Sequence, residues 1–340
     1  MANQRQIRCP GARTGAGDVY PGRTGRSSYR VAGRRHGRRQ KIIMDTADKS
    51  TKRVQARGGK TGATPTRVSI QGYEGSFHQV AAQQFFGAGV EVVTCATFRE
   101  VIRVASSQEE SDGGVMAIEN SIAGSILPNY NLLQKSNLRV VGEIYLQIGQ
   151  HLLVNPGVKL EDIREVHSHH MALLQCIDFL EKHPNWKLVE TEDTALSAKH
   201  LHQHRSKYTA AIASALAADL FGLEILAPNI QTMKNNYTRF LILQRQEDAV
   251  PVDQPDKASV NFHTDHSRGS LARVLTTIAN GGINLSKLQS FPIPGSEWEY
   301  SFHADMEFES MEQFQRVIEA IRPMTAELKI YGTYKKGRTV

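Results

Sequence analysis

From residue 67 onwards the chain repeats one pattern, a short β-rich run followed by a polar loop and a helix, and this repetition restricts the fold more than any other feature. The first set has expected strands at 68–70, 90–94 and 114–118 and expected helices at 77–86, 98–107 and 124–133. The second set has expected strands at 166–168, 186–190 and 210–213 and expected helices at 171–182, 194–202 and 215–221. Strands that alternate with helices predict an α/β sheet. Two such sets, joined by crossing strands at 140–143 and 150–154, predict two lobes with a cleft between them.

The order of elements changes after a polar linker at 251–256. Strands are expected at 258–264, 283–291, 297–308 and 326–331, and helices at 270–280 and 311–322. This βαββαβ order predicts a ferredoxin-like unit of about 75 residues. We therefore expect a C-terminal domain at 257–334 that follows an α/β domain at 67–246. Within the α/β domain the first lobe is expected at about 67–148 and 229–246, and the second at about 149–228.

The net charge of +7 is unevenly distributed along the chain. Residues 1–67 contain 17 Lys and Arg against 3 Asp and Glu, whereas the rest of the chain contains 24 against 31. The Gly-, Arg- and Thr-rich stretch at 1–66 is expected to be a disordered basic extension, with Met44 as an alternative start. It has no apolar region typical of a secretory signal; an organelle transit peptide, or a tail that binds nucleic acid or lipid, stays an alternative. The mildly acidic body argues against nucleic-acid binding.

Cysteine and histidine usage gives no sign of a disulfide framework or a metal site. Cys9, Cys95 and Cys176 are too few and too far apart for either, and a cytoplasmic protein is expected. The histidine groups at 167–170 and 200–204 lack a matching carboxylate or cysteine spacing, so we expect no metal. No run of about 18 apolar residues predicts a membrane span.

Polar loops follow the carboxyl ends of the expected strands, where open α/β folds bind ligands. Each of these loops precedes an expected helix, whose N-terminal N–H groups and dipole favour an anion. They comprise 72–76, 119–125, 167–170, 192–194 and Ser214. The glycines at 72 and 75 have the spacing of neither a P-loop nor a dinucleotide fingerprint. The loops together predict a site for a small polyanion, although each alone is also an ordinary turn with an N-cap.

The segment at 235–241 (NNYTRFL) places the hydroxyl of Thr238 beside the guanidinium of Arg239, at the start of an apolar strand. Adjacent strand residues point to opposite faces, but at a strand end beside a cleft both can reach one ligand. A hydroxyl can donate a proton, and an arginine can hold a carboxylate through two parallel hydrogen bonds, which predicts a small carboxylic acid substrate. The alternative is an exposed Thr and an Arg that lies over the sheet edge. Glu119 is a candidate general acid or base, or a structural carboxylate, and Cys176 is expected to be buried packing.

Taken in order, these motifs resemble the prephenate dehydratase family followed by an ACT regulatory domain, over about residues 68–333. The motifs are Gly72-x-x-Gly75-Ser76-Phe77, Glu119-Asn120-Ser121-x-x-Gly124, His167-Ser168-His169, Asp193-Thr194-Ala195, Ala211-Ile212-Ala213-Ser214 and Asn236-x-Thr238-Arg239-Phe240. The C-terminal part adds Gly269-Ser270-Leu271 ahead of Ile283-Asn284-Leu285. The chain departs from the family pattern at His78-Gln79 and at His170.

The resemblance implies a two-lobed, periplasmic-binding-protein-like domain that converts prephenate to phenylpyruvate in L-phenylalanine biosynthesis, with loss of water and carbon dioxide. It implies Thr238 as the proton donor, Arg239 as the ligand of a carboxylate and Glu119 as a further catalytic residue, with no metal or other cofactor. The implied substrate-binding residues are Gly75, Ser76, Asn120, Ser121, Thr194, Ser214, Asn236 and Phe240.

The resemblance also implies feedback by L-phenylalanine between paired ACT domains of a homodimer or homotetramer. The implied effector residues are Gly269, Ser270, Leu271, Asn284 and Leu285. Regulated members usually read Glu-Ser-Arg-Pro where this chain has Gln-Ser-Phe-Pro at 289–292, so effector sensitivity stays open. The alternatives are an arogenate dehydratase and a non-catalytic sensor of the same fold, which needs the arginine but no proton donor. No chorismate mutase segment is recognised in residues 1–67, so that step is expected on another chain.

Overall fold

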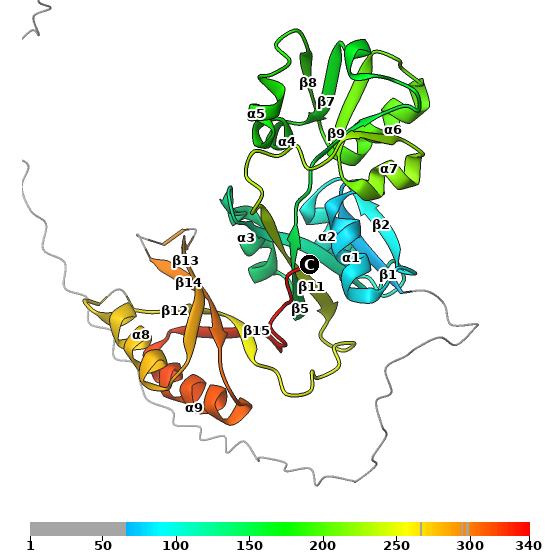
Figure 1. Cartoon of the computed structure of the whole chain (residues 1–340). Coiled ribbons are helices and arrows are strands. Elements are labelled where there is room, and N and C mark those ends of the chain that lie inside the picture. Colours follow the sequence, from blue (N-terminus) through cyan, green and yellow to red (C-terminus); the bar gives the residue numbers. More distant parts are fainter. Residues whose placement is uncertain (1–65, 266, 294, 297–298) are drawn as a thin grey trace, which may run out of the picture. The chain divides into compact units, whose positions relative to one another are not determined.

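The repeated strand–loop–helix pattern forms two α/β sheets, and the C-terminal part forms a third sheet (Figure 1). The structure is a computed structural model that describes residues 66–265, 267–293, 295–296 and 299–340. The described residues belong to one compact unit. The expectation of a disordered extension at 1–66 lies outside the described residues, apart from Thr66.

The first lobe is a mixed sheet of order β2-β1-β3-β11-β5, with β4 paired to β3. Its strands are β1 (Arg67–Gln71), β2 (Glu91–Cys95), β3 (Gly113–Asn120), β4 (Gly124–Ser125), β5 (Leu138–Gln147) and β11 (Tyr237–Arg245). Its helices are α1 (Phe77–Phe86), α2 (Phe98–Ala105) and α3 (Leu127–Lys135). β11 returns after the second lobe and runs antiparallel between β3 and β5. The strand that carries Thr238 is thus fixed on both sides.

Local sequence explains where these helices begin and where one of them differs from expectation. Ser76 accepts a hydrogen bond from the N–H of Gln79, and α1 spans the expected residues 77–86. The helix expected at 124–133 begins only at Leu127, because Gly124 and Ser125 form β4 instead. The loop at Ser121 is therefore a turn between strands rather than a helix N-terminus, which corrects that expectation.

The second lobe is a sheet of order β10-β6-β9-β7-β8. Its strands are β6 (His151–Val154), β7 (Glu165–His169), β8 (Lys187–Thr191), β9 (Thr209–Ala213) and β10 (Glu224–Ala227). Its helices are α4 (His170–Gln175), α5 (Ile177–Leu180), α6 (Thr194–His204), α7 (Ala215–Phe221) and the short η1 (Leu160–Asp162). The single helix expected at 171–182 is two helices, because Cys176 between them leaves helical geometry at φ −108°. The short edge strand β10 has no counterpart among the expected elements.

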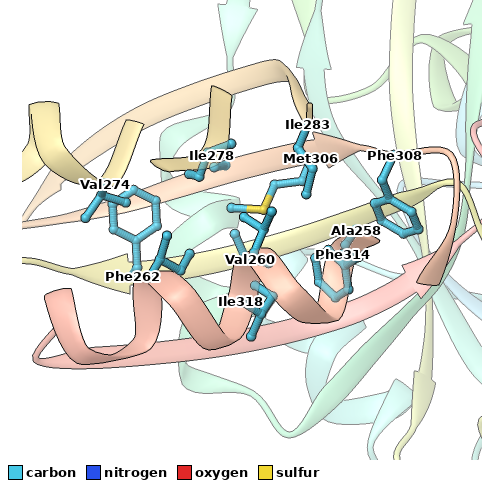
Figure 2. Packing of buried hydrophobic residues seen from close by; sticks show 13 residues of the cluster. Ala258, Val260, Phe262, Val274, Ile278, Ile283, Met306, Phe308, Phe314 and Ile318 are labelled. Carbon is cyan, nitrogen blue, oxygen red and sulfur yellow. The ribbon is translucent and has the colours of Figure 1, made fainter. Parts of the chain in front are cut away.

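The C-terminal part confirms the expected βαββαβ order, with a sheet of order β13-β14-β12-β15. Its elements are β12 (Lys257–His263), α8 (Ser270–Asn280), β13 (Asn284–Pro292), β14 (Tyr300–Glu307), α9 (Met311–Ile321), η2 (Arg322–Met324) and β15 (Glu327–Tyr334). Figure 2 shows Val260, Phe262 and Met306 of the sheet packed against Ile278 of α8 and Ile318 of α9. Both helices therefore cover one face of this sheet.

The opposite face of the C-terminal sheet is polar but buried. Because side chains alternate along a strand, Lys257 and Ser259 point away from the apolar core, as do His303 and Asp305 on β14. All four are at most 3% exposed. Two of them bind the first lobe directly, since Arg239 pairs with Asp305 and Glu143 accepts from Lys257. The mixed α/β fold class predicted from the sequence is confirmed. No helix among residues 66–265, 267–293, 295–296 and 299–340 is long and apolar enough to cross a membrane.

Candidate active site

Thr238 lies at the start of β11 in a group of amide side chains. The Nδ2 atom of Asn120, at the end of β3, lies 3.0 Å from Thr238 Oγ1 and 2.8 Å from Asn236 Oδ1. Asn236 is fully buried and donates in turn to Gln175 Oε1 at 3.0 Å. Since Asn120 donates to the oxygen of Thr238, the O–H of Thr238 stays free to donate elsewhere. The amide group thus orients the hydroxyl that the sequence singled out.

Gln175 is a residue of this group that sequence reasoning missed. It ends α4 of the second lobe and is 61 positions away from Asn236, which leads into β11 of the first lobe. Nothing in the residues around Gln175 distinguishes it from an ordinary helical glutamine. Only the packing of the second lobe against the first places its side chain at the site.

The loop at 72–76 of the first lobe meets two of the expected loops of the second lobe, at Glu192 and Ser214. Ser214 Oγ donates to the carbonyl oxygen of Gly75 at 2.6 Å, and the Tyr73 hydroxyl donates to Glu192 at 2.9 Å. Gly75 has a φ of +87°, and a Cβ atom there would lie 3.0 Å from the Cα atom of Ala217. A glycine is required for this approach, because any side chain would strain the backbone and press against α7.

The other expected substrate residues are spread around this contact. Ser76 is buried and caps α1, while Thr194 begins α6 after Asp193, whose pKa is raised by burial. Ser121 accepts a hydrogen bond from the N–H of Tyr237 at 2.9 Å and so ties the β3–β4 turn to the start of β11. Phe240 is buried beneath α1.

Arg239 and Glu119 do not lie with Thr238. Residues directly opposite each other in a strand pair share a face, and Thr238 pairs with Asn120 whereas Arg239 pairs with Glu119. The next pair is Phe240 with Ala117, so Ile118 is an extra residue in a β-bulge. Side chains alternate along β11, so Arg239 points to the face opposite Thr238. The bulge turns Glu119 to the same face as Arg239. This is the face that the C-terminal unit covers. The expectation that Thr238 and Arg239 reach one ligand is not met in this arrangement.

Arg239 is instead part of a buried ion network between the first lobe and the C-terminal unit. Its side chain is 4% exposed; Nε lies 2.7 Å from Glu143 Oε2, and Nη1 pairs with Asp305. Lys257 Nζ reaches the other oxygen of Glu143 at 2.9 Å. Burial alone would raise the pKa of the Asp305 carboxyl, but Arg239 and His303 outweigh it and hold that pKa well below its usual range. The Asp305 carboxylate is therefore ionised, and its charge is compensated by Arg239.

Two cavities bear on the expected binding sites, and neither has Thr238 or its amide partners in its lining. A cavity of 510 Å³ is lined by Phe77, Ser214 and residues of the connections between the lobes, including Gln147 and Lys234, but not by Thr238. A cavity of 210 Å³ in the C-terminal unit is lined by Thr264, Asp265, Ser267, Ser270, Leu271, Tyr300 and Phe302. Among the described side chains, no group of three or more His, Cys, Asp or Glu is arranged to hold a metal ion.

Comparison with known proteins identifies the family. The family model described as prephenate dehydratase matches residues 68–248, a range that includes Thr238 and every amide around it. The chain belongs to the prephenate dehydratase family. The family consists of enzymes, so the expectation of an enzyme is confirmed.

Curated relatives of this family align with most of the chain. A bifunctional chorismate mutase/prephenate dehydratase from Buchnera aphidicola subsp. Acyrthosiphon pisum (strain APS) is 32% identical over 274 residues, which cover 79% of this chain and 71% of the relative. Arogenate dehydratase 2 from Petunia hybrida is 35% identical over 291 residues, covering 81% of this chain and 73% of the relative.

Solved structures with the same fold include proteins of differing description. A prephenate dehydratase from Arthrobacter aurescens, solved in complex with L-Phe, has a TM-score of 0.71 and 26% identity and covers 79% of this chain and 90% of its own. GqqA, described as a novel type of quorum quenching acylase, has a TM-score of 0.72 and 29% identity and covers 80% of this chain and 98% of its own.

Proposed function

We propose that this prephenate dehydratase family member converts prephenate to phenylpyruvate, with Thr238 as the proton donor. The observation that carries the proposal is the 3.0 Å contact from Asn120 Nδ2 to Thr238 Oγ1, which leaves the Thr238 proton directed away from its amide partners. A sensor that only binds a carboxylate has no use for such a hydroxyl. The partly buried chain of hydrogen bonds from Asn120 through Asn236 to Gln175 holds it in one orientation.

The reaction needs little more than a held dianion and one proton. As the ring carboxylate leaves as carbon dioxide, its bonding electrons enter the ring, and the ring hydroxyl departs from the opposite carbon. Thr238 donates its proton to that hydroxyl, which leaves as water, and the ring becomes aromatic. A threonine hydroxyl is a weak acid, so donation has to be concerted with C–O cleavage. The Asn120 amide stabilises the negative charge that develops on Thr238 Oγ1, until that oxygen takes up a proton from water.

The geometry revises the roles proposed for the charged residues. Because Arg239 and Glu119 face the C-terminal unit, we assign them to positioning β11 and β3 rather than to contact with substrate. We infer that the carboxylates of the substrate bind at the N-termini of α1 and α7, where N–H groups favour an anion. Ser214 would then exchange its contact with the Gly75 carbonyl for a contact with substrate.

Arogenate is the second candidate substrate, since it differs from prephenate only by an amino group in place of the keto oxygen. The relative from Petunia hybrida supports this alternative. The proposed proton transfer is the same for both substrates, so the comparison of the two belongs in the same assay.

We further propose that the C-terminal unit, at about 257–334, is an ACT regulatory domain that binds L-phenylalanine. The solved relative in complex with L-Phe supports this proposal. The 210 Å³ cavity supports it as well, because Ser270 and Leu271 line it after Gly269, which has a φ of +78°. Asn284 and Leu285 lie outside its lining, so their effector role would require a second copy of the unit. A cytoplasmic homodimer or homotetramer is the proposed form.

The proposal is tested with purified protein and prephenate, by following phenylpyruvate through its absorbance in alkali, with arogenate and L-phenylalanine in parallel assays. Thr238→Ala is expected to lower kcat by about 10²–10⁴-fold, the usual contribution of a positioned proton donor, at nearly unchanged substrate affinity. Thr238→Ser keeps the hydroxyl and is the control. Equal turnover by wild type and Thr238→Ala would exclude the role, and no product from either substrate would exclude the proposed function.

A further inference from the structure

One side chain of the C-terminal unit reaches the end of the strand that carries Asn120. Lys287, on the edge strand β13, forms an ion pair with Glu119 and lies 2.6 Å from Ser125 Oγ. The side chains of Lys287 and Glu119 are 15% and 30% exposed, so the pair is shielded more than the surface pairs that contribute little. Glu119 and Ser125 face each other across the β3–β4 pairing, and Lys287 therefore holds both strands of that hairpin.

The held hairpin determines where the amide of Asn120 lies. Asn120 directly follows Glu119 and pairs with Gly124 across the same hairpin. Its Oδ1 atom accepts hydrogen bonds from the N–H groups of Ile122 and Ala123 at 3.0 and 2.9 Å. With its oxygen fixed by the turn, its Nδ2 group reaches Thr238. A displacement of the hairpin would therefore move the amide against the proposed proton donor.

We propose that Lys287 is a positioning residue for the dehydration: through Glu119 it fixes the β3–β4 hairpin, and through Asn120 it orients the hydroxyl of Thr238. This inference rests on the proposed function. It explains why Glu119 faces the C-terminal unit although it neighbours the amide at the site. It also connects β13, which carries the segment 289–292, to Thr238 through the hairpin. Within that segment, Gln289 Oε1 lies 3.4 Å from Ser125 Oγ of the hairpin.

A second lysine of the C-terminal unit provides a matched control. Lys329, on β15, donates to the carbonyl oxygens of Gln134 and Ser136 at 2.9 Å each. It thus bridges the same unit to the first lobe at the end of α3, without contact to the hairpin. Lys329→Met removes a contact between the C-terminal unit and the first lobe that does not involve the hairpin. Lys287→Met removes the contact between the same two parts that holds Glu119.

The experiment measures kcat and KM for prephenate in Lys287→Met, Lys287→Arg, Lys329→Met and wild type, together with amide hydrogen exchange at Ile122 and Ala123. Lys287→Met is expected to lower kcat by about 10–100-fold with little change in KM, because a misplacement of about 1 Å can cost about 10²-fold. It should also speed exchange of the two amides. Lys287→Arg should restore most of the rate, and Lys329→Met should stay within about twofold of wild type in both measurements.

Two outcomes would overturn the inference. Equal losses in Lys287→Met and Lys329→Met would mean that general docking of the C-terminal unit matters rather than the hairpin. Unchanged exchange at Ile122 and Ala123 in Lys287→Met would show that Lys287 does not fix the hairpin, whatever the substrate. Failure of the proposed function is distinguished from both, because it appears as an absence of phenylpyruvate with wild-type protein, while the exchange comparison still decides the role of Lys287.

Discussion

His78 provides a quantitative test of how the first lobe is packed. It lies on α1, where it is 9% exposed, and its ring centroid lies 4.9 Å from that of Phe240 and 5.5 Å from that of Phe98. Its Nε2 atom accepts a hydrogen bond from the N–H of Ala117, which requires that this nitrogen carry no proton. Burial lowers the pKa of His78 from 6.5 to about 3.

This pKa shift fixes the sign and the size of a pH effect on stability. In the unfolded chain His78 takes up a proton below pH 6.5, whereas in the folded protein it does so only near pH 3, so the unfolded state binds more protons between these values. The contribution of neutral, buried His78 to the free energy of unfolding is complete above pH 6.5. Below pH 6.5 it is lost at about 1.4 kcal/mol per pH unit, until the pH nears 3. Between pH 7.5 and pH 5.0 the expected loss in free energy of unfolding is about 2 kcal/mol.

The assay is urea unfolding of wild type and His78→Gln at pH 7.5 and pH 5.0. For each protein, the change in free energy of unfolding between the two pH values is determined. Comparing these changes between the two proteins removes the contribution of the titrating groups that they share. Wild type should lose about 2 kcal/mol more than His78→Gln. Phe98→Leu, which alters the same packing without a titrating group, should behave like wild type. A difference below about 0.5 kcal/mol, which is near the error of such extrapolations, would refute the reasoning.

Two further predictions concern the connections between parts of the structure. Glu143→Gln removes the charge that pairs with Arg239 and leaves a buried cation less compensated. It should therefore lower the free energy of unfolding by about 3–5 kcal/mol. Urea unfolding at pH 7.5 checks this, and a loss below about 1 kcal/mol would contradict it. Gly75→Ala should lower kcat/KM for prephenate far more than Gly87→Ala. Both positions have positive φ, at +87° and +96°, but only the Cβ atom at 75 would meet Ala217 of the other lobe, whereas the one at 87 would meet nothing within 4 Å. Equal effects of the two substitutions in steady-state assays would argue against this lobe contact.

The sequence alone was sufficient for the order and kind of most elements. The helices α1, α7 and α8 span the residues expected for them. For α1 and α7 the reason lies within a few residues, since Ser76 and Ser214 accept hydrogen bonds from the third following N–H. The edge strand β10 had no such signal, as it is four residues long and half exposed. Asn120, Asn236 and Thr238 were also indicated as motif residues, although the hydrogen bonds that join them were not predicted.

What only the tertiary structure decided is which face the charged residues occupy and what they meet there. The sequence could not show the bulge at Ile118, because a bulge is a property of the pairing between β3 and β11 rather than of either strand. Nor could it show that Arg239 meets Asp305, 66 positions later, or that Glu119 meets Lys287, 168 positions later. Such contacts depend on how whole sheets pack against one another. The residues Asn120, Asn236 and Thr238 of the proposed site were therefore readable from the sequence, while Gln175, the faces of Arg239 and Glu119 and the connection to the C-terminal unit were set by packing.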